Sequence, residues 1–254
     1  MKHLPSLPLL TLFLLLSGPA AADGHDGESA CSADGYMLVM GGVADPASVP
    51  DPERAAKYGP AVWDLVESYG AFYLVRNVPD VIYEGDWPDW KAVVISKWPC
   101  RETGLEFWYS DAYQNEVKPL RKDAGAYDVG MFDQCDPGAR AETEDVVPDA
   151  CTDPFLVVGM TKVTDTEAYS RYSQAIRSSN LPRRAGYTLL FSGQPKEVLE
   201  GDWPADYSTM VSVYPCREAW EAFYNGEPYV SEIKPLRAGA GDFLILGFQP
   251  ERLE

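Results

Sequence analysis

The sequence predicts an α+β protein made of two tandem copies of one β-α-β-β-α-β unit. Three motifs recur in the same order and at the same offset: EGDWP at residues 84–88 and 200–204, WPCRE or YPCRE at 98–102 and 214–218, and KPLR at 118–121 and 234–237. One register kept over such a length indicates a duplicated domain. Each copy has about 100 residues, which is the usual size of a single domain.

Each unit opens with an apolar, β-rich segment, at residues 36–43 in the first copy and 155–163 in the second. A helix is expected to follow. In the first copy Asp51 is a candidate N-cap, and Pro52 suits the first helical position. Pro60 is expected to bend or break this helix, because proline has no backbone N–H to donate.

The remaining elements follow in the same order in both copies. Second strands, third strands, second helices and fourth strands are expected at residues 71–78 and 187–193, 91–98 and 208–214, 101–109 and 217–225, and 127–133 and 242–248. This order is the ferredoxin-like split β-α-β arrangement. It places EGDWP in the connection between strands two and three.

The chain begins with the features of a secretory signal peptide. Lys2 precedes an apolar run at residues 9–16, and three alanines at 20–22 form a small-residue cleavage site. The run is shorter than the roughly 20 residues that span a bilayer. We expect a signal peptide at 1–22, a polar tail at 23–35, repeats at 36–134 and 153–254, and an acidic linker at 135–152. The cleaved protein is expected to be periplasmic or secreted and free of the membrane.

Charge and histidine content exclude several functions. The formal net charge of −18 disfavours binding to nucleic acid or to anionic membranes. The two histidines, His3 and His25, lie in the predicted signal peptide and polar tail. Ser-His-Asp catalysis, haem held by histidine and histidine-rich zinc sites are therefore not expected. We predict no cofactor and no metal site.

The motifs and the segments between them resemble one protein family. The combination VIYEGDWPDWKAVVISKWP, FWYSDAYQ and KPLR, and its second-copy counterpart VLEGDWPADYSTMVSVYP, FYNGEPYV and KPLR, are similar to the domain of unknown function 1330 family over residues 36–133 and 155–249. The resemblance implies a dimeric α+β barrel, in which two ferredoxin-like units pair sheet against sheet. Here both units belong to one chain, so the resemblance implies an intrachain pseudo-dimer and a monomeric protein. Ser192 stands where the first unit has Arg76, an arginine common in this family. If Arg76 is a ligand-binding residue, the two pockets are not equivalent.

The cysteines allow several pairings. In an exported protein the five cysteines are expected to be oxidised, in at most two bridges within the chain. Strand four should lie antiparallel beside strand one, which favours a disulfide between Cys31 and Cys135. Cys135–Cys151 is the competing pair. Cys100 and Cys216 could bridge only near a pseudo-twofold axis, and otherwise each lies at a helix N-terminus.

Candidate ligand-binding residues each have a plainer structural interpretation. Asp86 and Trp87, with Asp202 and Trp203, could form a pocket rim, but Gly-Asp-Trp-Pro is also favourable turn chemistry. The arginines of the KPLR motifs, Arg121 and Arg237, could bind a substrate carboxylate, or could pair with the EGDW carboxylates of their own unit. Tyr58 and Tyr172 could line a pocket or belong to the core.

Three functions remain open at this point. The first is binding of a small aromatic or carboxylated molecule in a pocket between helices and sheet. The second is a cofactor-independent oxygenase or isomerase activity, by analogy with proteins of the same barrel architecture. The third is a structural or partner-binding role without a pocket.

Overall fold

The computed structural model describes residues 31–135, 151–203 and 205–253. The predicted signal peptide, most of the polar tail and most of the acidic linker lie outside these residues. Within the described part of the chain, no helix is long and apolar enough to cross a membrane.

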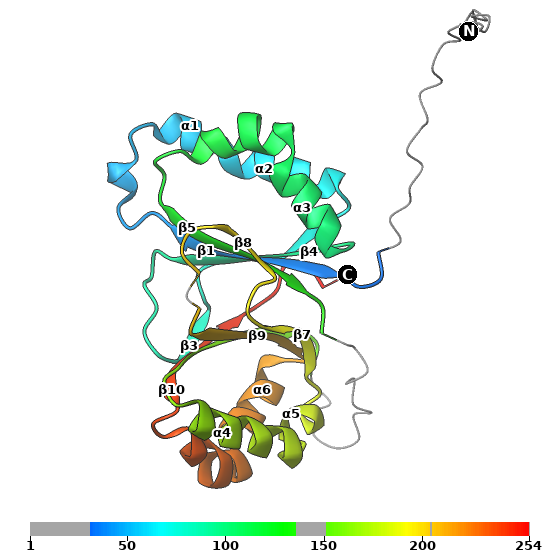
Figure 1. Ribbon diagram of the computed structural model, residues 1–254. Coiled ribbons are helices and arrows are strands. Elements are labelled where there is room, and N and C mark those ends of the chain that lie inside the picture. Colours follow the sequence, from blue (N-terminus) through cyan, green and yellow to red (C-terminus); the bar gives the residue numbers. More distant parts are fainter. Residues whose placement is uncertain (1–30, 136–150, 204, 254) are drawn as a thin grey trace, which may run out of the picture. The chain divides into compact units, whose positions relative to one another are not determined.

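Apart from η1 of the first unit, the described elements of the two units follow the same order (Figure 1). The first unit has β1 (Gly35–Gly42), η1 (Pro46–Ser48), α1 (Pro52–Ala56), α2 (Tyr58–Ser68), β2 (Phe72–Asn77), β3 (Val81–Glu84), β4 (Ala92–Trp98), α3 (Arg101–Tyr109), η2 (Ala112–Val117), η3 (Lys118–Arg121) and β5 (Ala126–Asp133). The second has β6 (Phe155–Val163), α4 (Thr166–Ser179), α5 (Leu181–Arg184), β7 (Thr188–Gly193), β8 (Glu197–Glu200), β9 (Tyr207–Tyr214), α6 (Arg217–Tyr224), η5 (Pro228–Ile233), η6 (Lys234–Arg237) and β10 (Gly241–Phe248).

The units exchange one strand each. The two sheets have the strand orders β2-β4-β1-β5-β8 and β3-β10-β6-β9-β7, so β3 belongs to the sheet of the second unit and β8 to that of the first. Glu84 lies opposite Ile245 of β10, and Glu200 lies opposite Val129 of β5. The predicted α+β fold of two paired units is confirmed. The sequence did not predict the exchanged strands β3 and β8, which each pair with a strand of the other unit.

The inner faces of the two sheets form one shared hydrophobic core. It joins Leu38 and Ile95 of the first sheet to Leu156, Phe191 and other residues of the second. Tyr36 stacks on Phe191 across the interface, with ring centroids 5.1 Å apart. The helices cover the outer face of each sheet, α1–α3 on the first and α4–α6 on the second (Figure 1).

The predicted first helix is interrupted. Asp51 caps α1, where its carboxylate accepts a hydrogen bond of 2.9 Å from the backbone N–H of Arg54. The break falls at Lys57, and α2 then begins at Tyr58. Pro60 therefore lies in the first turn of α2, where a missing N–H leaves no helical hydrogen bond unmade. This placement brings the Tyr58 side chain over the sheet.

Two disulfides connect equivalent positions, and neither is the predicted one. They join Cys31 to Cys100 and Cys151 to Cys216, whereas Cys135 is free. The predicted Cys31–Cys135 pair is wrong because β1 lies between β4 and β5, so the start of β1 is equally close to the end of β4.

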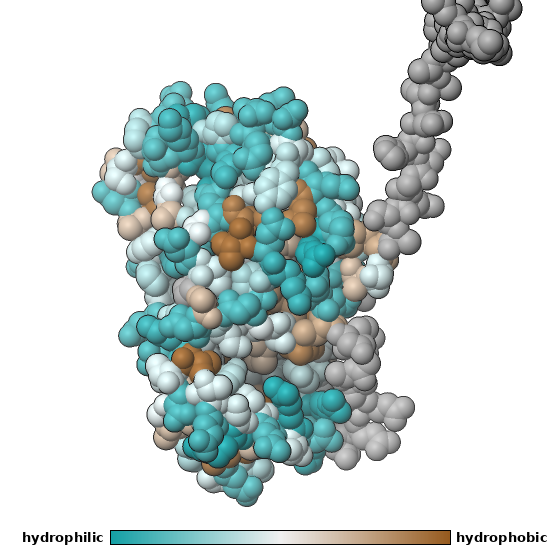
Figure 2. All heavy atoms as spheres, viewed as in Figure 1, coloured by the Kyte–Doolittle hydropathy of each residue, from teal (hydrophilic) through white to brown (hydrophobic). Residues whose placement is uncertain are grey.

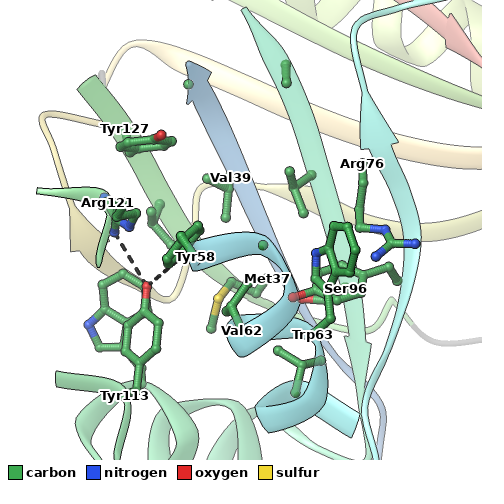
Figure 3. Close-up of a pocket in the computed structure, with 18 of the residues that line it drawn as sticks. Met37, Val39, Tyr58, Val62, Trp63, Arg76, Ser96, Tyr113, Arg121 and Tyr127 are labelled. Carbon is green, nitrogen blue, oxygen red and sulfur yellow. Dashed lines mark hydrogen bonds between the residues drawn. The ribbon is translucent and has the colours of Figure 1, made fainter. Parts of the chain in front are cut away.

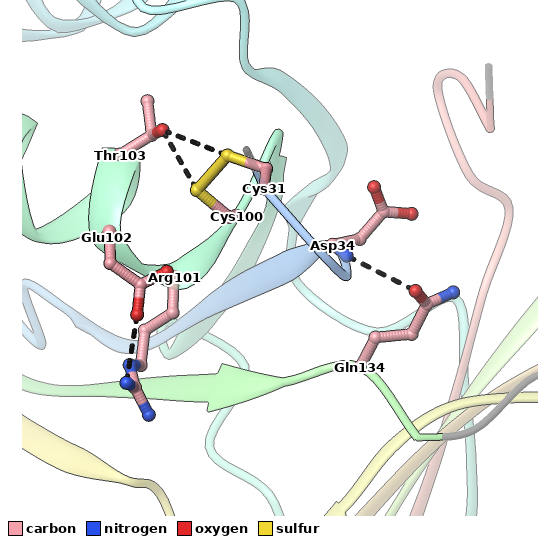
Figure 4. The surroundings of a disulfide bond; sticks show 7 residues. All are labelled: Cys31, Asp34, Cys100, Arg101, Glu102, Thr103 and Gln134. Carbon is pink, nitrogen blue, oxygen red and sulfur yellow. Dashed lines mark hydrogen bonds and ion pairs between the residues drawn. A yellow bond between two sulfur atoms is a disulfide. The ribbon is translucent and has the colours of Figure 1, made fainter. Parts of the chain in front are cut away.

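The ends of the first unit show why Cys100 is the partner. Cys100 follows β4 directly and starts α3, beside Cys31 (Figure 4). Cys135 instead turns to the second unit, where its N–H donates to the Leu190 carbonyl at 2.9 Å. Two disulfides are typical of proteins from an oxidising compartment.

Candidate ligand-binding pocket

A cavity of about 280 Å³ lies between the outer face of the first sheet and its helices (Figure 3). Its floor consists of alternate, outward-facing residues of β1 and β4, among them Val39, Val94 and Ser96. The helix α2 contributes Val62 and other side chains from the opposite side. Aromatic rings supply most of the remaining wall: Tyr58, Trp63, Tyr73, Trp98, Phe107, Trp108, Tyr113 and Tyr127.

The tyrosine hydroxyls at one end of the cavity form a short network. The Tyr58 and Tyr113 hydroxyls are 3.4 Å apart, and an Arg121 amino group donates to the Tyr113 hydroxyl at 3.4 Å. Burial raises the pKa of both tyrosines above the ordinary value, although Arg121 opposes this shift. These hydroxyls therefore remain protonated near neutral pH and act as hydrogen-bonding groups.

Arg121 is neutralised by a carboxylate of the other unit. Its two terminal amino groups donate to the two oxygens of Glu200 at 2.8 and 2.7 Å, and Lys118 pairs with the same carboxylate at 2.9 Å. Only 8% of the Arg121 side chain is exposed. The sequence suggested that Arg121 could bind a substrate carboxylate through two hydrogen bonds. In the structure, Glu200 of the protein itself supplies that carboxylate.

The second unit has the matching arrangement. Arg237 donates to Glu84 of the first unit at 2.6 Å, and the Tyr224 hydroxyl donates to the same carboxylate at 2.6 Å. The expectation of ion pairs within one unit is therefore wrong. Because β3 and β8 are exchanged, each EGDW glutamate reaches the KPLR arginine of the opposite unit.

Arg76 is the second cation that lines the cavity, and its surroundings differ. The guanidinium lies over the Trp63 ring at 4.3 Å and over the Tyr73 ring at 4.9 Å. Its Nε donates to both carboxylate oxygens of Glu251 at 3.0 Å, and an amino group donates to the same residue. Both members of this pair are partly open to solvent, with 28% of Arg76 and 31% of Glu251 exposed.

The EGDWP residues lie away from the cavity. Asp86 and Asp202 are exposed, and neither lines it. Trp87 and Trp203 pack against the core between the sheets instead. Trp203 meets Phe132 edge to face, with centroids 5.6 Å apart. The two tryptophans thus belong to the core between the sheets, and the two aspartates are not part of the cavity lining.

The corresponding region of the second unit has different walls. Tyr172 does occupy the position of Tyr58, and its hydroxyl lies 3.1 Å from that of Tyr229. On the sheet, however, Met210 takes the place of Val94, and Ser192 that of Arg76. The Met210 methyl group lies over Gly159, the counterpart of Val39. The two halves are therefore unequal on their outer faces.

Several lining residues are not among the sequence candidates. Tyr73, Val94 and Trp98 line the cavity because they lie on the outer face of the first sheet. Trp63 lines it from α2. The alternation along residues 91–98 carries a signal for Val94 and Trp98. No sequence pattern identifies Glu251, because it is distant in the chain from Arg76. The fold alone brings its carboxylate to the Arg76 guanidinium. Of the residues the structure describes, no three His, Cys, Asp or Glu side chains are grouped as a metal site.

Comparison with known proteins agrees with this architecture. The family model of the domain of unknown function DUF1330 matches residues 43–134 and 154–248, so the chain belongs to that family. No curated protein is similar to it at a significant level.

Solved structures with a similar fold include two from different bacteria. One is a protein from Fusobacterium nucleatum provisionally named a monooxygenase, with a TM-score of 0.54 and 10% identity over 87% of this chain and 94% of that one. Another is a mutant chlorite dismutase from Candidatus Nitrospira defluvii, with a TM-score of 0.48 and 11% identity over 88% of this chain and 92% of that one. At 10% identity the likeness to the Fusobacterium nucleatum protein concerns the fold alone.

Proposed function

We propose that the protein binds a small, largely apolar aromatic molecule in the cavity of the first unit. The observation that supports this most directly is the lining, in which aromatic faces and aliphatic side chains surround about 280 Å³ of space. Binding sites for small molecules are typically concave and apolar, with a few polar groups that orient the ligand. Here the hydroxyls of Tyr58 and Tyr113 and the Arg76 guanidinium are such groups.

Binding is favoured over the oxygenase or isomerase alternative because the cavity lacks a general base. Its lining contains no histidine, aspartate or glutamate among the described residues. The tyrosines keep their protons, and Arg121 is held by Glu200. A reaction that begins with proton abstraction would need a group of suitable pKa within hydrogen-bonding reach of the substrate.

A cavity-filling substitution tests this proposal with a control inside the same chain. Val94→Phe places a ring in the cavity, whereas Met210→Phe makes a similar change at the corresponding site of the second unit. With 2-naphthol as probe, we expect calorimetry to show binding to the wild type and to Met210→Phe, and at least tenfold weaker binding to Val94→Phe. Equal affinity in all three proteins would contradict the site.

The natural ligand can be sought directly. Native mass spectrometry of the protein purified from its own source is expected to show an adduct that is released on denaturation. The same adduct should be absent from Val94→Phe produced in the same way. An adduct that survives this substitution would lie elsewhere on the protein.

A further inference from the structure

We propose that the ligand of this cavity carries a carboxylate that binds Arg76, and that Glu251 takes its place while the cavity is empty. This inference rests on the proposed function, because it assigns a chemical class to the ligand of the same pocket. The C-terminal segment would then act as an internal competitor. An aromatic ring would occupy the apolar interior, with its carboxylate at the position of the Glu251 carboxylate.

The two cations of the cavity differ in how firmly they are held. Arg121 is buried and is bound by Glu200 in a bidentate pair that Lys118 reinforces. Displacing Glu200 would remove the partner of the buried Arg121 charge and of Lys118 together. The Arg76–Glu251 pair is partly exposed, and ion pairs that are open to solvent contribute little to stability. Exchange of the Glu251 carboxylate for a ligand carboxylate therefore costs little free energy at Arg76, whereas a similar exchange at Arg121 is unfavourable.

Arg76 is also placed for recognition of an aromatic carboxylate. Its guanidinium lies over the Trp63 and Tyr73 rings, both of which line the cavity. A guanidinium packed on aromatic rings can still donate its N–H groups to a carboxylate in its own plane. Glu251 already demonstrates this geometry, since the Arg76 Nε donates to both of its oxygens.

The segment that carries Glu251 is anchored by its backbone and not by this ion pair. The Glu251 N–H donates to the Leu74 carbonyl at 2.8 Å, and the Gln249 N–H donates to the Asp80 carboxylate at 2.6 Å. Leu253 packs against the core between the sheets. The Glu251 side chain can consequently leave Arg76 while the segment remains in place.

The second unit indicates that the barrel itself does not need this pair. Ser192 stands at the position of Arg76, on the matching strand and in the matching register. By contrast, the pair between a KPLR arginine and an EGDWP glutamate occurs in both halves, as Arg121–Glu200 and as Arg237–Glu84. The Arg76 subsite is thus confined to the half that contains the cavity.

The test compares a carboxylate probe with an uncharged probe of the same shape. Calorimetry with 2-naphthoate and 2-naphthamide is carried out on the full chain and on Glu251→Gln, Arg76→Met and the double variant. Glu251→Gln should bind 2-naphthoate about threefold to fivefold more tightly than the wild type, because the ligand no longer has to displace the Glu251 carboxylate from Arg76. Binding of 2-naphthamide should change less than about twofold.

Arg76→Met should abolish the preference for the carboxylate in both backgrounds. Glu102→Gln serves as the control for net charge, because its partner Arg101 lies at the start of α3 and neither residue lines the cavity. If both probes bind and Glu251→Gln leaves the naphthoate affinity unchanged, the subsite is overturned while the pocket function stands. If neither probe binds to any variant, the pocket function is overturned, and the subsite with it.

Discussion

Arg121 and Arg237 show why the EGDWP motif begins with glutamate. Each guanidinium is almost completely buried among aromatic side chains, where an unpaired charge would be strongly destabilising. The partner carboxylate arrives from the opposite unit, as Glu200 for Arg121 and Glu84 for Arg237. A single residue type at one motif position thus connects the two halves of the molecule twice.

Glu200→Gln should lower the free energy of unfolding by about 2 kcal/mol at pH 7. This lies below the 3–5 kcal/mol typical of a broken buried pair, because Glu200 is partly exposed and glutamine keeps one acceptor for Arg121. Denaturant unfolding measures the difference. As a control, Glu167→Gln removes the partner of Arg171 at an exposed helix position and should change stability by less than about 0.5 kcal/mol.

The cost of this substitution should depend on pH. Burial alone would raise the pKa of Glu200, but hydrogen bonds from Arg121 and Lys118 outweigh it and lower the pKa below its ordinary value. The stabilisation from ionised Glu200 is therefore complete above the unfolded-state pKa of about 4.3 and is lost as the pH falls through the folded-state pKa. The stability difference between the wild type and Glu200→Gln should therefore begin to shrink as the pH falls below about 4.3, and should disappear only below the lowered folded-state pKa. A constant difference down to pH 3 would contradict this assignment.

At the level of elements, the motif glycine makes the exchanged strand possible. Gly201 ends β8 with φ of +77°, and a Cβ atom there would lie 2.5 Å from both the Tyr127 carbonyl and the Asp128 carboxylate. Glycine is therefore required both for its left-handed backbone and for the close approach to β5. Gly85 has the same role beside β10, with φ of +80°.

Gly201→Ala should destabilise the protein by roughly 3 kcal/mol. About 1 kcal/mol comes from the left-handed backbone, and the rest from the overlap with β5. Gly193→Ala separates these two causes, because Gly193 has φ of +99° but no atom within 4 Å of the point where a Cβ would lie. It should cost about 1 kcal/mol. Equal losses in thermal or denaturant unfolding would show that contact with β5 is unimportant.

Sequence reasoning could identify the elements but not the partners that lie far away in the chain. The repeat and its apolar periodicity predicted four of the five strands of each sheet, and Asp51 predicted where the first helix starts. The break that Pro60 indicated falls three residues earlier, at Lys57. The strands β3 and β8 and their exchange were missed, because a four-residue strand carries no local signal of which sheet it joins. The partner of Cys31 was missed for a similar reason, since β1 has neighbours on both sides.

The same limit applies to the pocket. Tyr58, Arg76 and Arg121 are sequence candidates that line the cavity, whereas Asp86 and Asp202 are candidates that do not. The difference depends on the path of the turn after β3 and β8. Glu251 could not be connected to Arg76 from the sequence, because the segment after β10 crosses to β2 of the other unit.

For the whole molecule, three features make the two units interdependent. They share one core between the sheets, they exchange β3 and β8, and they are joined by two pseudo-symmetric ion pairs. A separated unit would lose a strand of its sheet and expose the inner face of that sheet. The inner face is mostly apolar, with Leu38, Val93 and Ile95 fully buried in the first unit.

The face of the molecule shown in Figure 2 has no large apolar patch that would indicate a further permanent interface. On the face shown in Figure 2, apolar side chains form small separate patches in a mostly hydrophilic surface. The exchanged strands at the sheet edges have only four residues each, and short edge strands limit pairing with another chain. With its internal pseudo-dimer, the protein is therefore expected to be a monomer.

We accordingly expect one cooperative unfolding transition and the mass of a single chain. In calorimetry under non-reducing conditions, the calorimetric and van't Hoff enthalpies should agree, because neither half can lose the shared core alone. Light scattering should give one chain, and the midpoint temperature should not change with protein concentration. Two separate transitions would show that the units are stable independently of each other. A midpoint that rises with concentration would show instead that the paired sheets need a second copy of the chain.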